Sequence, residues 1–267
     1  MSNKKAIVTG CSSGIGRATA LELTARRYEV VATARRHESI ADLAVARTLT
    51  LDVDSDESVA AAQAAVGPVD VLVNNAGFGI DGPVEEVPLD EVRRAFETNF
   101  FGAARMIQAF VPAMRERGSG TVVNVTSVAG IVGSPLAGFY SATKFALEAL
   151  SESLHIEVGH FGVRVLVVEP GAIATRFGDN MVDLRGRPGP YAELAKKWES
   201  AMGVLGGDEP TPGPELVATK ICDALEEEHR SLRLPVGSDA ELIASSRQGV
   251  SYDDFEAAMR AVLQIDW

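Results

Sequence analysis

Tyr140 and Lys144 stand four residues apart in a stretch that predicts a helix over Phe139–His160, so their side chains share one helix face. A tyrosine phenol has an ordinary pKa of about 10, which is too high for efficient proton transfer at neutral pH. A nearby ammonium group favours the phenolate and lowers that pKa. The pair therefore predicts a tyrosine that gives or takes a proton. Lys144 would supply the charge, and its three N–H donors can also hold a sugar hydroxyl.

Two further polar residues extend this pattern. Ser127 comes just after the predicted strand Thr121–Val125, where its hydroxyl can bind a substrate oxygen and stabilise charge that develops there. Asn99 lies inside the predicted helix Leu89–Arg117, where asparagine is unfavourable. A water bound to its freed backbone carbonyl would relay protons to Lys144. Taken singly, each signal has a plain alternative: a chance Tyr-x3-Lys spacing, or a tolerated polar residue in a helix.

A glycine-rich turn joins the predicted strand Ala6–Thr9 to the predicted helix Ile15–Arg27, and it reads Gly10-Cys11-Ser12-Ser13-Gly14-Ile15-Gly16. A turn without side chains lets the backbone approach a pyrophosphate, which binds the N–H groups at the helix start. The two serine hydroxyls can add donors, and the last glycine allows the helix to pack closely on the sheet. Because the spacing is Gly-x3-Gly-x-Gly, a purely structural turn is the alternative. Cys11 is interpreted as a small filler.

The second predicted strand, Glu29–Ala34, is followed by two arginines rather than an acid, and the first acid is Glu38. A dinucleotide fold places an acid here to bind a free 2′-hydroxyl, or an arginine to accommodate a 2′-phosphate. Guanidinium binds phosphate through charge-assisted hydrogen bonds. We therefore predict a preference for NADP(H), with Arg35 the first candidate and Arg36 the second. The alternative is a solvated basic pair.

Small and polar residues also follow the third and fourth predicted strands, Thr48–Leu51 and Val69–Val73. Asp52, followed by Val53, could accept a hydrogen bond from an adenine amino group; taken alone, it is better interpreted as a helix-capping acid ahead of Ser55–Val59. The later run permits close approach to a ribose and hydrogen bonds between strands, with a structural turn as the alternative; it reads Asn74-Asn75-Ala76-Gly77.

These residues sit within a regular alternation of strands and helices. Besides those named, a strand is predicted at Val163–Val168 and a helix at Ser55–Ala65. Nearly continuous Val, Ile and Leu runs are typical of strands buried on both faces of a parallel sheet. The rhythm predicts a doubly wound α/β sheet, whose ligands lie beyond the carboxyl ends of its strands.

After Pro170 the composition changes: residues 171–214 hold eight glycines and five prolines around one predicted helix, Tyr191–Met202. We interpret residues 176–210 as a mobile segment that covers the substrate; a surface insertion without a role is the alternative. Further predicted elements complete one domain over residues 1–267, namely a helix at Pro214–Glu228, a strand at Leu232–Val236 and a helical tail ending at Trp267.

Composition excludes several classes of function. A formal net charge of −12 disfavours a nucleic-acid partner. Two cysteines, Cys11 and Cys222, form neither a disulfide framework nor a metal site, and the four histidines show no metal pattern. Neither a signal peptide nor a membrane span is expected, and a cytoplasmic location is the simpler interpretation.

Together these motifs resemble the short-chain dehydrogenase/reductase family, in its order and spacing across residues 4 to 175. The matching pieces are Thr9-Gly10-x3-Gly14-x-Gly16, Asp52-Val53, Asn74-Asn75-Ala76-Gly77, Asn99, Ser127, Tyr140-x3-Lys144 and Pro170-Gly171-x3-Thr175. Runs such as Ala32-Thr33-Ala34-Arg35 look like the 17β-hydroxysteroid/retinol-dehydrogenase-like subgroup.

The resemblance implies a single-domain Rossmann-type fold with a seven-stranded parallel sheet in the order 3-2-1-4-5-6-7. It implies a catalytic tetrad of Asn99, Ser127, Tyr140 and Lys144. It also implies a loop that holds the nicotinamide carboxamide, formed by Pro170, Gly171, Ile173 and Thr175. Many members are dimers or tetramers joined through the helices equivalent to Leu89–Arg117 and Phe139–His160.

The resulting hypothesis is an oxidoreductase that transfers a hydride between NADP(H) and a carbonyl or alcohol substrate, with Tyr140 as general acid or base. The alternatives are an NAD-dependent alcohol dehydrogenase of the same fold and a non-catalytic NADP sensor, which would not need the tetrad. The substrate leans hydrophobic, because the residues that could line its pocket are apolar, although each could equally be core: Phe78, Ile80, Val132, Phe139 and the 176–210 segment.

Overall fold

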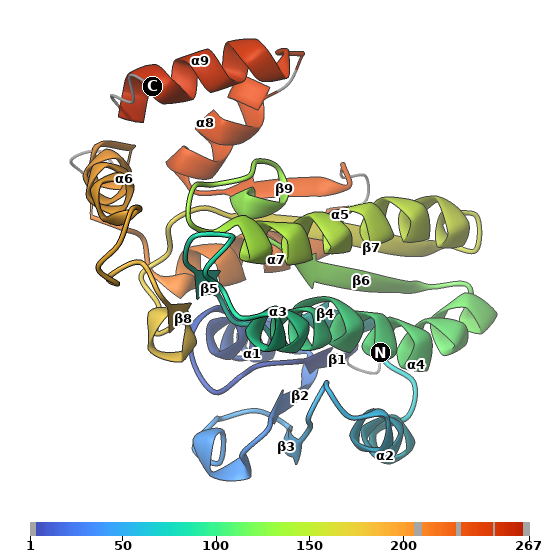
Figure 1. The fold of residues 1–267 in the computed structure, drawn as a ribbon. Coiled ribbons are helices and arrows are strands. Elements are labelled where there is room, and N and C mark those ends of the chain that lie inside the picture. The colour runs from blue at the N-terminus through green and yellow to red at the C-terminus, as the bar shows by residue number, and fades with distance from the viewer. Residues whose placement is uncertain (1–3, 206–209, 228–230, 248, 264–267) are drawn as a thin grey trace.

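The computed structural model describes residues 4–205, 210–227, 231–247 and 249–263, with a seven-stranded parallel sheet at its centre (Figure 1). The strands lie in the order β3-β2-β1-β4-β6-β7-β9, and every neighbouring pair is parallel. Counted within this sheet, that is the predicted order 3-2-1-4-5-6-7, so the predicted fold class is confirmed. Their bounds are β1 Lys5–Val8, β2 Glu29–Ala34, β3 Arg47–Thr50, β4 Val71–Asn74, β6 Gly120–Val125, β7 Val163–Pro170 and β9 Arg233–Val236.

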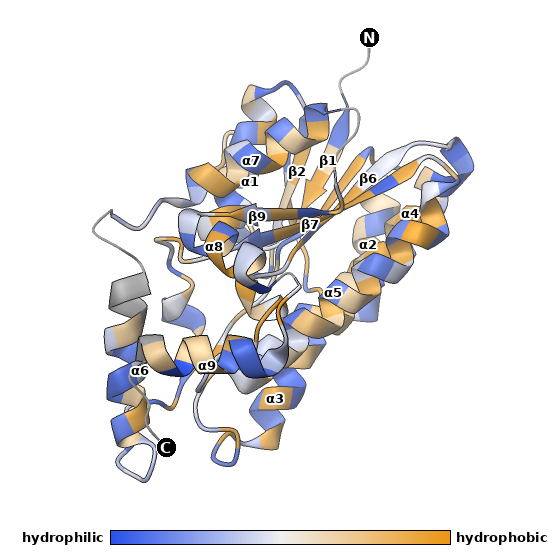
Figure 2. Cartoon of the chain, turned by 90° about the horizontal axis from the view of Figure 1, so that it is seen from above, coloured by the Kyte–Doolittle hydropathy of each residue, from blue (hydrophilic) through white to orange (hydrophobic). Residues whose placement is uncertain are grey.

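Alternating residues of each central strand supply two separate cores. In β1, Ala6 and Val8 pack with the layer of α1 (Gly14–Ala25) and α7 (Pro214–Glu226). Ile7 points to the opposite face, which is covered by α2 (Asp56–Val66), α4 (Ala103–Arg117) and α5 (Gly138–Gly159). Figure 2 shows the apolar strands between these two helical layers. Burial on both faces explains why the strands are continuous in Val, Ile and Leu.

The predicted helix Leu89–Arg117 is divided into three parts. Residues Leu89–Phe96 form α3, Glu97–Gly102 form a π-helical turn, and α4 follows directly. A π turn makes room for one extra residue per turn and commonly occurs at functional sites. Here it contains Asn99, the residue that looked out of place in a helix. A side chain at Gly102 would collide with Val53, so this turn also packs against the loop after β3.

The segment after β7 packs against the chain that follows β4. The short strand β8 (Val182–Asp183) pairs in parallel with β5 (Ile80–Asp81), and the helix α6 (Ala192–Leu205) follows. The predicted tail consists of two helices, α8 (Ser238–Arg247) and α9 (Tyr252–Leu263). The predicted ends at Glu228 and Trp267 lie outside the described residues.

The helix α6 packs against α9. Trp198 and Ala201 are buried, and Met259 of α9 packs against them. Figure 1 shows α6, α8 and α9 together at one end of the molecule. In the described part of the chain, no helix has the length and apolar character needed to cross a bilayer.

Candidate active site

The loops after β1 and β4 are tied together at the carboxyl edge of the sheet. The Thr9 hydroxyl accepts hydrogen bonds from the backbone N–H groups of Asn75 and Ala76, at 2.9 and 3.0 Å. The Asn75 amide donates back to the carbonyl of Thr9 at 2.9 Å and to that of Gly10 at 3.3 Å. Asn74 instead donates to Asn124 of β6 at 2.9 Å, which bridges two strands. The run after β4 therefore braces the glycine turn.

At each of the three glycines of the turn, a side chain is sterically unfavourable. Gly10 has a φ of 73°, and a Cβ there would lie 2.9 Å from the Cα of Ala76. Gly14 has a φ of 57° and faces Thr175. A Cβ at Gly16 would collide with the Asn75 amide and the Gly10 carbonyl. The start of α1 therefore packs closely on the residues that follow β1 and β4, at the edge of the sheet.

The start of α1 presents donors in the same place. Ser13 is the N-cap residue in an extended conformation, and its hydroxyl makes no bond to the helix. Ser12 is exposed, and Ile15 packs against the core. The first-turn N–H groups of a helix have no intrahelical partner, so they can bind an anion. Cys11 is buried, its Sγ lies 3.2 Å from the Val8 carbonyl, and burial raises its pKa to about 12, which fits an inert filler.

The candidates for the adenosine end lie after β2 and β3. Arg35 and Arg36 are exposed, and within the described residues neither guanidinium makes a hydrogen bond or ion pair. Asp52 Oδ1 accepts the N–H of Asp54 at 3.2 Å. Asp52 does not cap α2, because Ser55 is the N-cap residue and accepts the Ser58 N–H at 3.2 Å. The capping alternative for Asp52 is therefore wrong.

Asn99 connects three elements of the site through its side chain, which is 1% exposed. Its Oδ1 accepts the Phe78 N–H at 3.0 Å, and its Nδ2 donates to the Phe78 carbonyl at 2.9 Å and to the Thr143 hydroxyl at 3.1 Å. Gly77 lies beside it: a Cβ there would be 3.0 Å from Asn99 Oδ1 and 3.8 Å from Lys144 Nζ. The structure thus brings Asn99, Gly77 and Lys144 together. The proton relay through the Asn99 carbonyl stays a prediction.

Ser127 lies near Tyr140, and its hydroxyl lowers the pKa of the phenol. Ser127 follows β6 as the N-cap residue of a short 3-10 turn, Val128–Gly130, and its Oγ accepts the Ala129 N–H at 3.1 Å. Tyr140 lies in the first turn of α5. Because the loop after β6 leads directly into this helix, the hydroxyl and the phenol converge although thirteen residues separate them in the sequence.

The expected lowering of the Tyr140 pKa is wrong in this structure. Burial raises the pKa of Tyr140 to about 12, the Ser127 hydrogen bond lowers it, and the Asp81 carboxylate raises it further. Burial also lowers the pKa of Lys144 to about 8, against the opposing effect of Glu148. Lys144 Nζ donates to the Val125 carbonyl at 3.0 Å and lies 5.7 Å from the centre of the Tyr140 ring. Burial is therefore the largest influence on the pKa of both groups.

The loop after β7 lies beside the glycine turn. The Ala172 N–H donates to Asp239 Oδ2 at 2.6 Å, and Ile173 packs against the core. Thr175 contacts Gly14, so the residues Pro170, Gly171, Ile173 and Thr175 lead from β7 to the glycine turn. Asp239, at the start of α8, was not a candidate; its only sequence signal is an acid in the first turn of a helix.

The apolar residues expected to line the substrate pocket lie in different parts of the structure. Ile80 and Val132 are buried, so they belong to the core. Phe78 and Phe139 pack in a small cluster with Val182 and Leu184. The aromatic side chain beside the site is instead Phe177, whose ring centre lies 5.8 Å from that of Tyr140. Nothing in the sequence singled it out from the other apolar residues of its segment.

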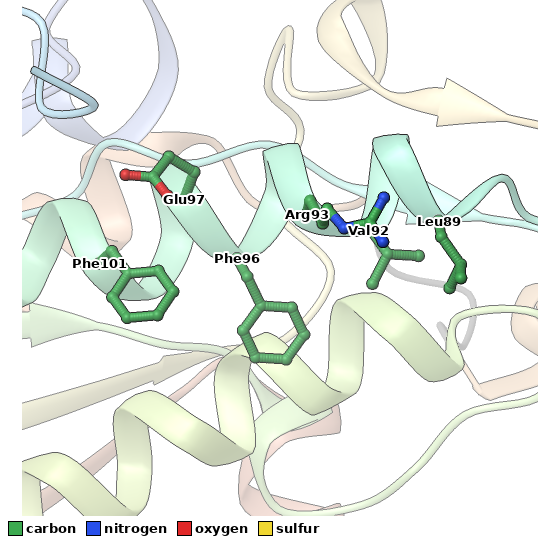
Figure 3. A pocket seen from close by; sticks show the side chains of 6 residues that line it. All are labelled: Leu89, Val92, Arg93, Phe96, Glu97 and Phe101. Carbon is green, nitrogen blue, oxygen red and sulfur yellow. The ribbon is translucent and has the colours of Figure 1, made fainter.

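A separate hollow lies on α3 and the π turn, and no tetrad residue lines it (Figure 3). Figure 3 shows the rings of Phe96 and Phe101 projecting from this helical stretch. The hollow is largely apolar, and its lining residues are Leu89, Val92, Arg93, Phe96, Glu97 and Phe101. It is therefore a surface feature of this helix rather than part of the candidate active site.

Comparison with known proteins decides the family. The family model for short chain dehydrogenases matches residues 4–184. The chain belongs to this family. This short-chain dehydrogenase is 34% identical to the uncharacterized oxidoreductase YusZ of Bacillus subtilis, over 98% of this chain and 99% of the relative. It is an oxidoreductase of a family that acts on CH–OH and C=O groups with nicotinamide cofactors, as predicted.

The subgroup is also confirmed. This short-chain dehydrogenase is 45% identical to human retinol dehydrogenase 8 over 64% of its length, and 44% identical to mouse 17-beta-hydroxysteroid dehydrogenase type 1 over 71%. It spans 59% of each of these two relatives.

Solved structures share the whole fold. A short-chain dehydrogenase from Streptomyces avermitilis superimposes with a TM-score of 0.84 at 38% identity, with both chains covered completely. One from Burkholderia cenocepacia, in complex with NADP, superimposes with a TM-score of 0.78 at 26% identity over 99% of both chains.

Proposed function

We propose that this short-chain dehydrogenase transfers a hydride between NADP(H) and a hydrophobic ketone, aldehyde or alcohol, with Tyr140 as the proton donor or acceptor. The observation that carries this proposal is the placement of Lys144 Nζ 5.7 Å from the centre of the Tyr140 ring, with Ser127 close enough to lower the pKa of the phenol and Asn99 bonded to Thr143 of the same helix. A hydroxyl and a phenol at this spacing can together bind one carbonyl oxygen. The NADP sensor is disfavoured, because sensing requires no such pair.

The residues of the carboxyl edge fit a dinucleotide. A side chain at Gly10 would collide with the backbone of Ala76, and one at Gly16 with the Gly10 carbonyl, so these glycines let the turn pack closely against the loop after β4. The donors of Ser12, Ser13 and the α1 N-terminus would hold the pyrophosphate, and Asp52 with Val53 would lie near the adenine. The exposed guanidiniums of Arg35 and Arg36 would bind a 2′-phosphate.

The nicotinamide half would rest on the other side of the same edge. The backbone of Asn74–Gly77 and the ammonium of Lys144 would hold its ribose, and the loop from Pro170 to Thr175 would hold its carboxamide. When bound, the cofactor supplies or accepts the hydride. A comparison of NADPH and NADH in a binding titration separates this proposal from the NAD-dependent alternative.

The protein side chains would orient the oxygen and move the proton. Ser127 and Tyr140 would both bind the substrate oxygen, which fixes it for attack. With its pKa raised to about 12, Tyr140 stays protonated at neutral pH, and this is the form that gives a proton to a carbonyl oxygen. Lys144 and Asn99 would return a proton from the solvent side.

The segment 176–210 is proposed to cover the substrate. It is joined to the loop after β4 by the β5–β8 pairing, by the ion pair of Arg185 with Asp81 at 3.0 Å and by the hydrogen bond from Tyr191 to Glu85 at 2.9 Å. Phe177 from this segment lies against Tyr140, so an apolar surface faces the reacting position. This arrangement supports a hydrophobic substrate and argues against an insertion without a role.

A homodimer or homotetramer is proposed through the long helices, as expected from the family. Large apolar side chains are exposed on α3, the π turn and α5, among them Leu89, Phe101, Phe145 and Ile156. Ile156 is 78% exposed, which is unfavourable for a side chain of this size in water. Light scattering of the purified protein measures the mass directly. The cytoplasmic location stays a prediction.

Replacement of the phenol tests the function. Tyr140→Phe removes the proton donor and keeps the ring, so turnover of NADPH with a panel of ketones and aldehydes should fall at least about a hundredfold. NADPH affinity should stay within about threefold of the wild type, because the phenol is a minor part of the cofactor contacts. A Tyr140→Phe protein with wild-type turnover would overturn the proposed role.

A further inference from the structure

A charged cluster lies directly behind the tetrad. Arg233 of β9 is surrounded by three carboxylates: its Nη2 lies 3.0 Å from Glu148 and 2.7 Å from Glu152, and its Nε lies 3.0 Å from Glu169. Glu148 is 5% exposed and Glu169 is 1% exposed. Burying ionised carboxylates is costly unless they are paired and hydrogen-bonded. One guanidinium cannot neutralise three of them, so the cluster carries excess negative charge.

The cluster lies next to two residues of the tetrad, Lys144 and Ser127. Glu148 lies one helical turn after Lys144 on α5, so the two side chains share a face. Its Oε1 is 2.6 Å from the hydroxyl of Thr126, the residue before Ser127. Gly130 closes this contact: a Cβ there would lie 3.0 Å from Glu148 Cγ and 3.3 Å from Lys144 Cβ. The Lys144–Glu148 turn is thus held tightly against the Ser127 loop.

Lys144 has few other means of staying charged. Its side chain is buried, and its Nζ donates to a neutral backbone carbonyl, that of Val125. Burial lowers its pKa, and the carboxylate of Glu148 is the group that raises it again. The other ionisable groups that act on this turn or its neighbours are Tyr140 and Glu152 on α5, Glu169 on β7, Arg233 on β9 and Asp81 on β5.

Glu148 is itself fixed by two partners. The Thr126 hydroxyl and the Arg233 guanidinium both favour its ionised form, against a burial effect that raises its pKa. A glutamine would fill the same volume and keep an acceptor for Thr126. Packing alone therefore does not require a carboxylate at this position, whereas the charges of Arg233 and Lys144 both favour one.

We propose that Glu148, held by Thr126 and Arg233, is a positioning residue that keeps Lys144 protonated and in place beside Tyr140. The proposal rests on the proposed function, because it gives Lys144 a counter-charge for a role in that reaction. Through Arg233 it also connects the last strand of the sheet, β9, to the tetrad.

The direct test is a titration of Lys144 itself. The chain has six lysines, so Cε resonances of the full-length protein, labelled at lysine, can be followed by NMR, with Lys144→Met to assign the signal. In Glu148→Gln the pKa of Lys144 should fall by about one unit, a roughly tenfold change in the ratio of charged to neutral amine. Glu148→Met should lower it similarly, and it serves if the first variant fails to fold, since apolar replacement of a buried charge is often tolerated.

Glu152→Gln is the matched control, because it removes a half-exposed carboxylate from the same arginine. It should leave the Lys144 pKa unchanged. An unaltered Lys144 pKa in both Glu148 variants would overturn the proposal. As a second measurement, the alkaline limb of the NADPH-dependent reduction rate should move to lower pH in Glu148→Gln; an equal loss at every pH would instead indicate a structural role only. Full activity of Tyr140→Phe would overturn the proposed function without affecting the titration.

Discussion

Asn99 Nδ2 lies 3.1 Å from the hydroxyl of Thr143, the residue immediately before Lys144. The same amide group satisfies both the N–H and the carbonyl of Phe78. A single buried side chain therefore joins the π turn, the loop after β4 and the helix α5, which carries Tyr140 and Lys144. This gives Asn99 a positioning role that does not depend on any water at its backbone carbonyl.

Replacing Asn99 should therefore destabilise the protein as well as slow it. Asn99→Leu leaves the part-buried N–H and carbonyl of Phe78 without the partners they have in the wild type, which costs about 1–3 kcal/mol for each such group. We expect a fall of about 2–6 kcal/mol in the free energy of unfolding, measured by urea denaturation. Asn180→Leu, at an exposed position, is the control and should change it little. Equal stability of the two variants would contradict this account.

The glycine turn offers a matched pair of substitutions. Gly10→Ala forces a side chain into a backbone with a φ of 73°, against the Cα of Ala76 at 2.9 Å. We expect a loss of stability of more than about 1 kcal/mol and at least about tenfold weaker NADPH binding. Gly133→Ala meets no atom within 4 Å and should leave both quantities near the wild type. Fluorescence titration with NADPH and thermal unfolding measure the two effects.

Because of Glu169, the free energy of unfolding should depend on pH between pH 4.5 and about 7. Burial, and then the Glu148 carboxylate, raise its pKa from 4.5 to about 7, although Arg233 lowers it. The folded protein therefore binds more protons than the unfolded chain between these values, so this contribution is fully present below pH 4.5 and is lost as pH rises towards 7. The free energy of unfolding of the wild type, minus that of Glu169→Gln, should decline by up to about 3 kcal/mol across that window. Urea unfolding at several pH values measures it, and a difference that rises with pH would show that Glu169 is ionised throughout.

Sequence reasoning predicted the fold correctly and named the tetrad candidates because both rest on local signals. Strands buried on both faces leave uninterrupted Val and Ile runs, and residues such as Ser127 follow them directly. It missed the β5–β8 pairing, because strands of two residues carry no periodicity and owe their place to contacts 100 residues apart. It also gave the wrong sign for the Tyr140 pKa, since spacing reveals which charge is near but not how deeply both groups are buried.

Cofactor choice can be tested at the end of β2, where Arg35 follows the last strand residue and its guanidinium is exposed. Arg35→Asp replaces a phosphate-binding fork by a charge that repels a 2′-phosphate and can bind a 2′-hydroxyl. We expect kcat/KM with NADPH to fall about 10- to 1000-fold, mainly through KM, and kcat/KM with NADH to be unchanged or raised. Arg36→Asp is the control at the neighbouring position: a larger loss there would transfer the phosphate to Arg36. If neither variant altered the ratio of the two cofactors, the 2′-phosphate would lie elsewhere or would not be read at all, and the NAD-dependent alternative would take precedence.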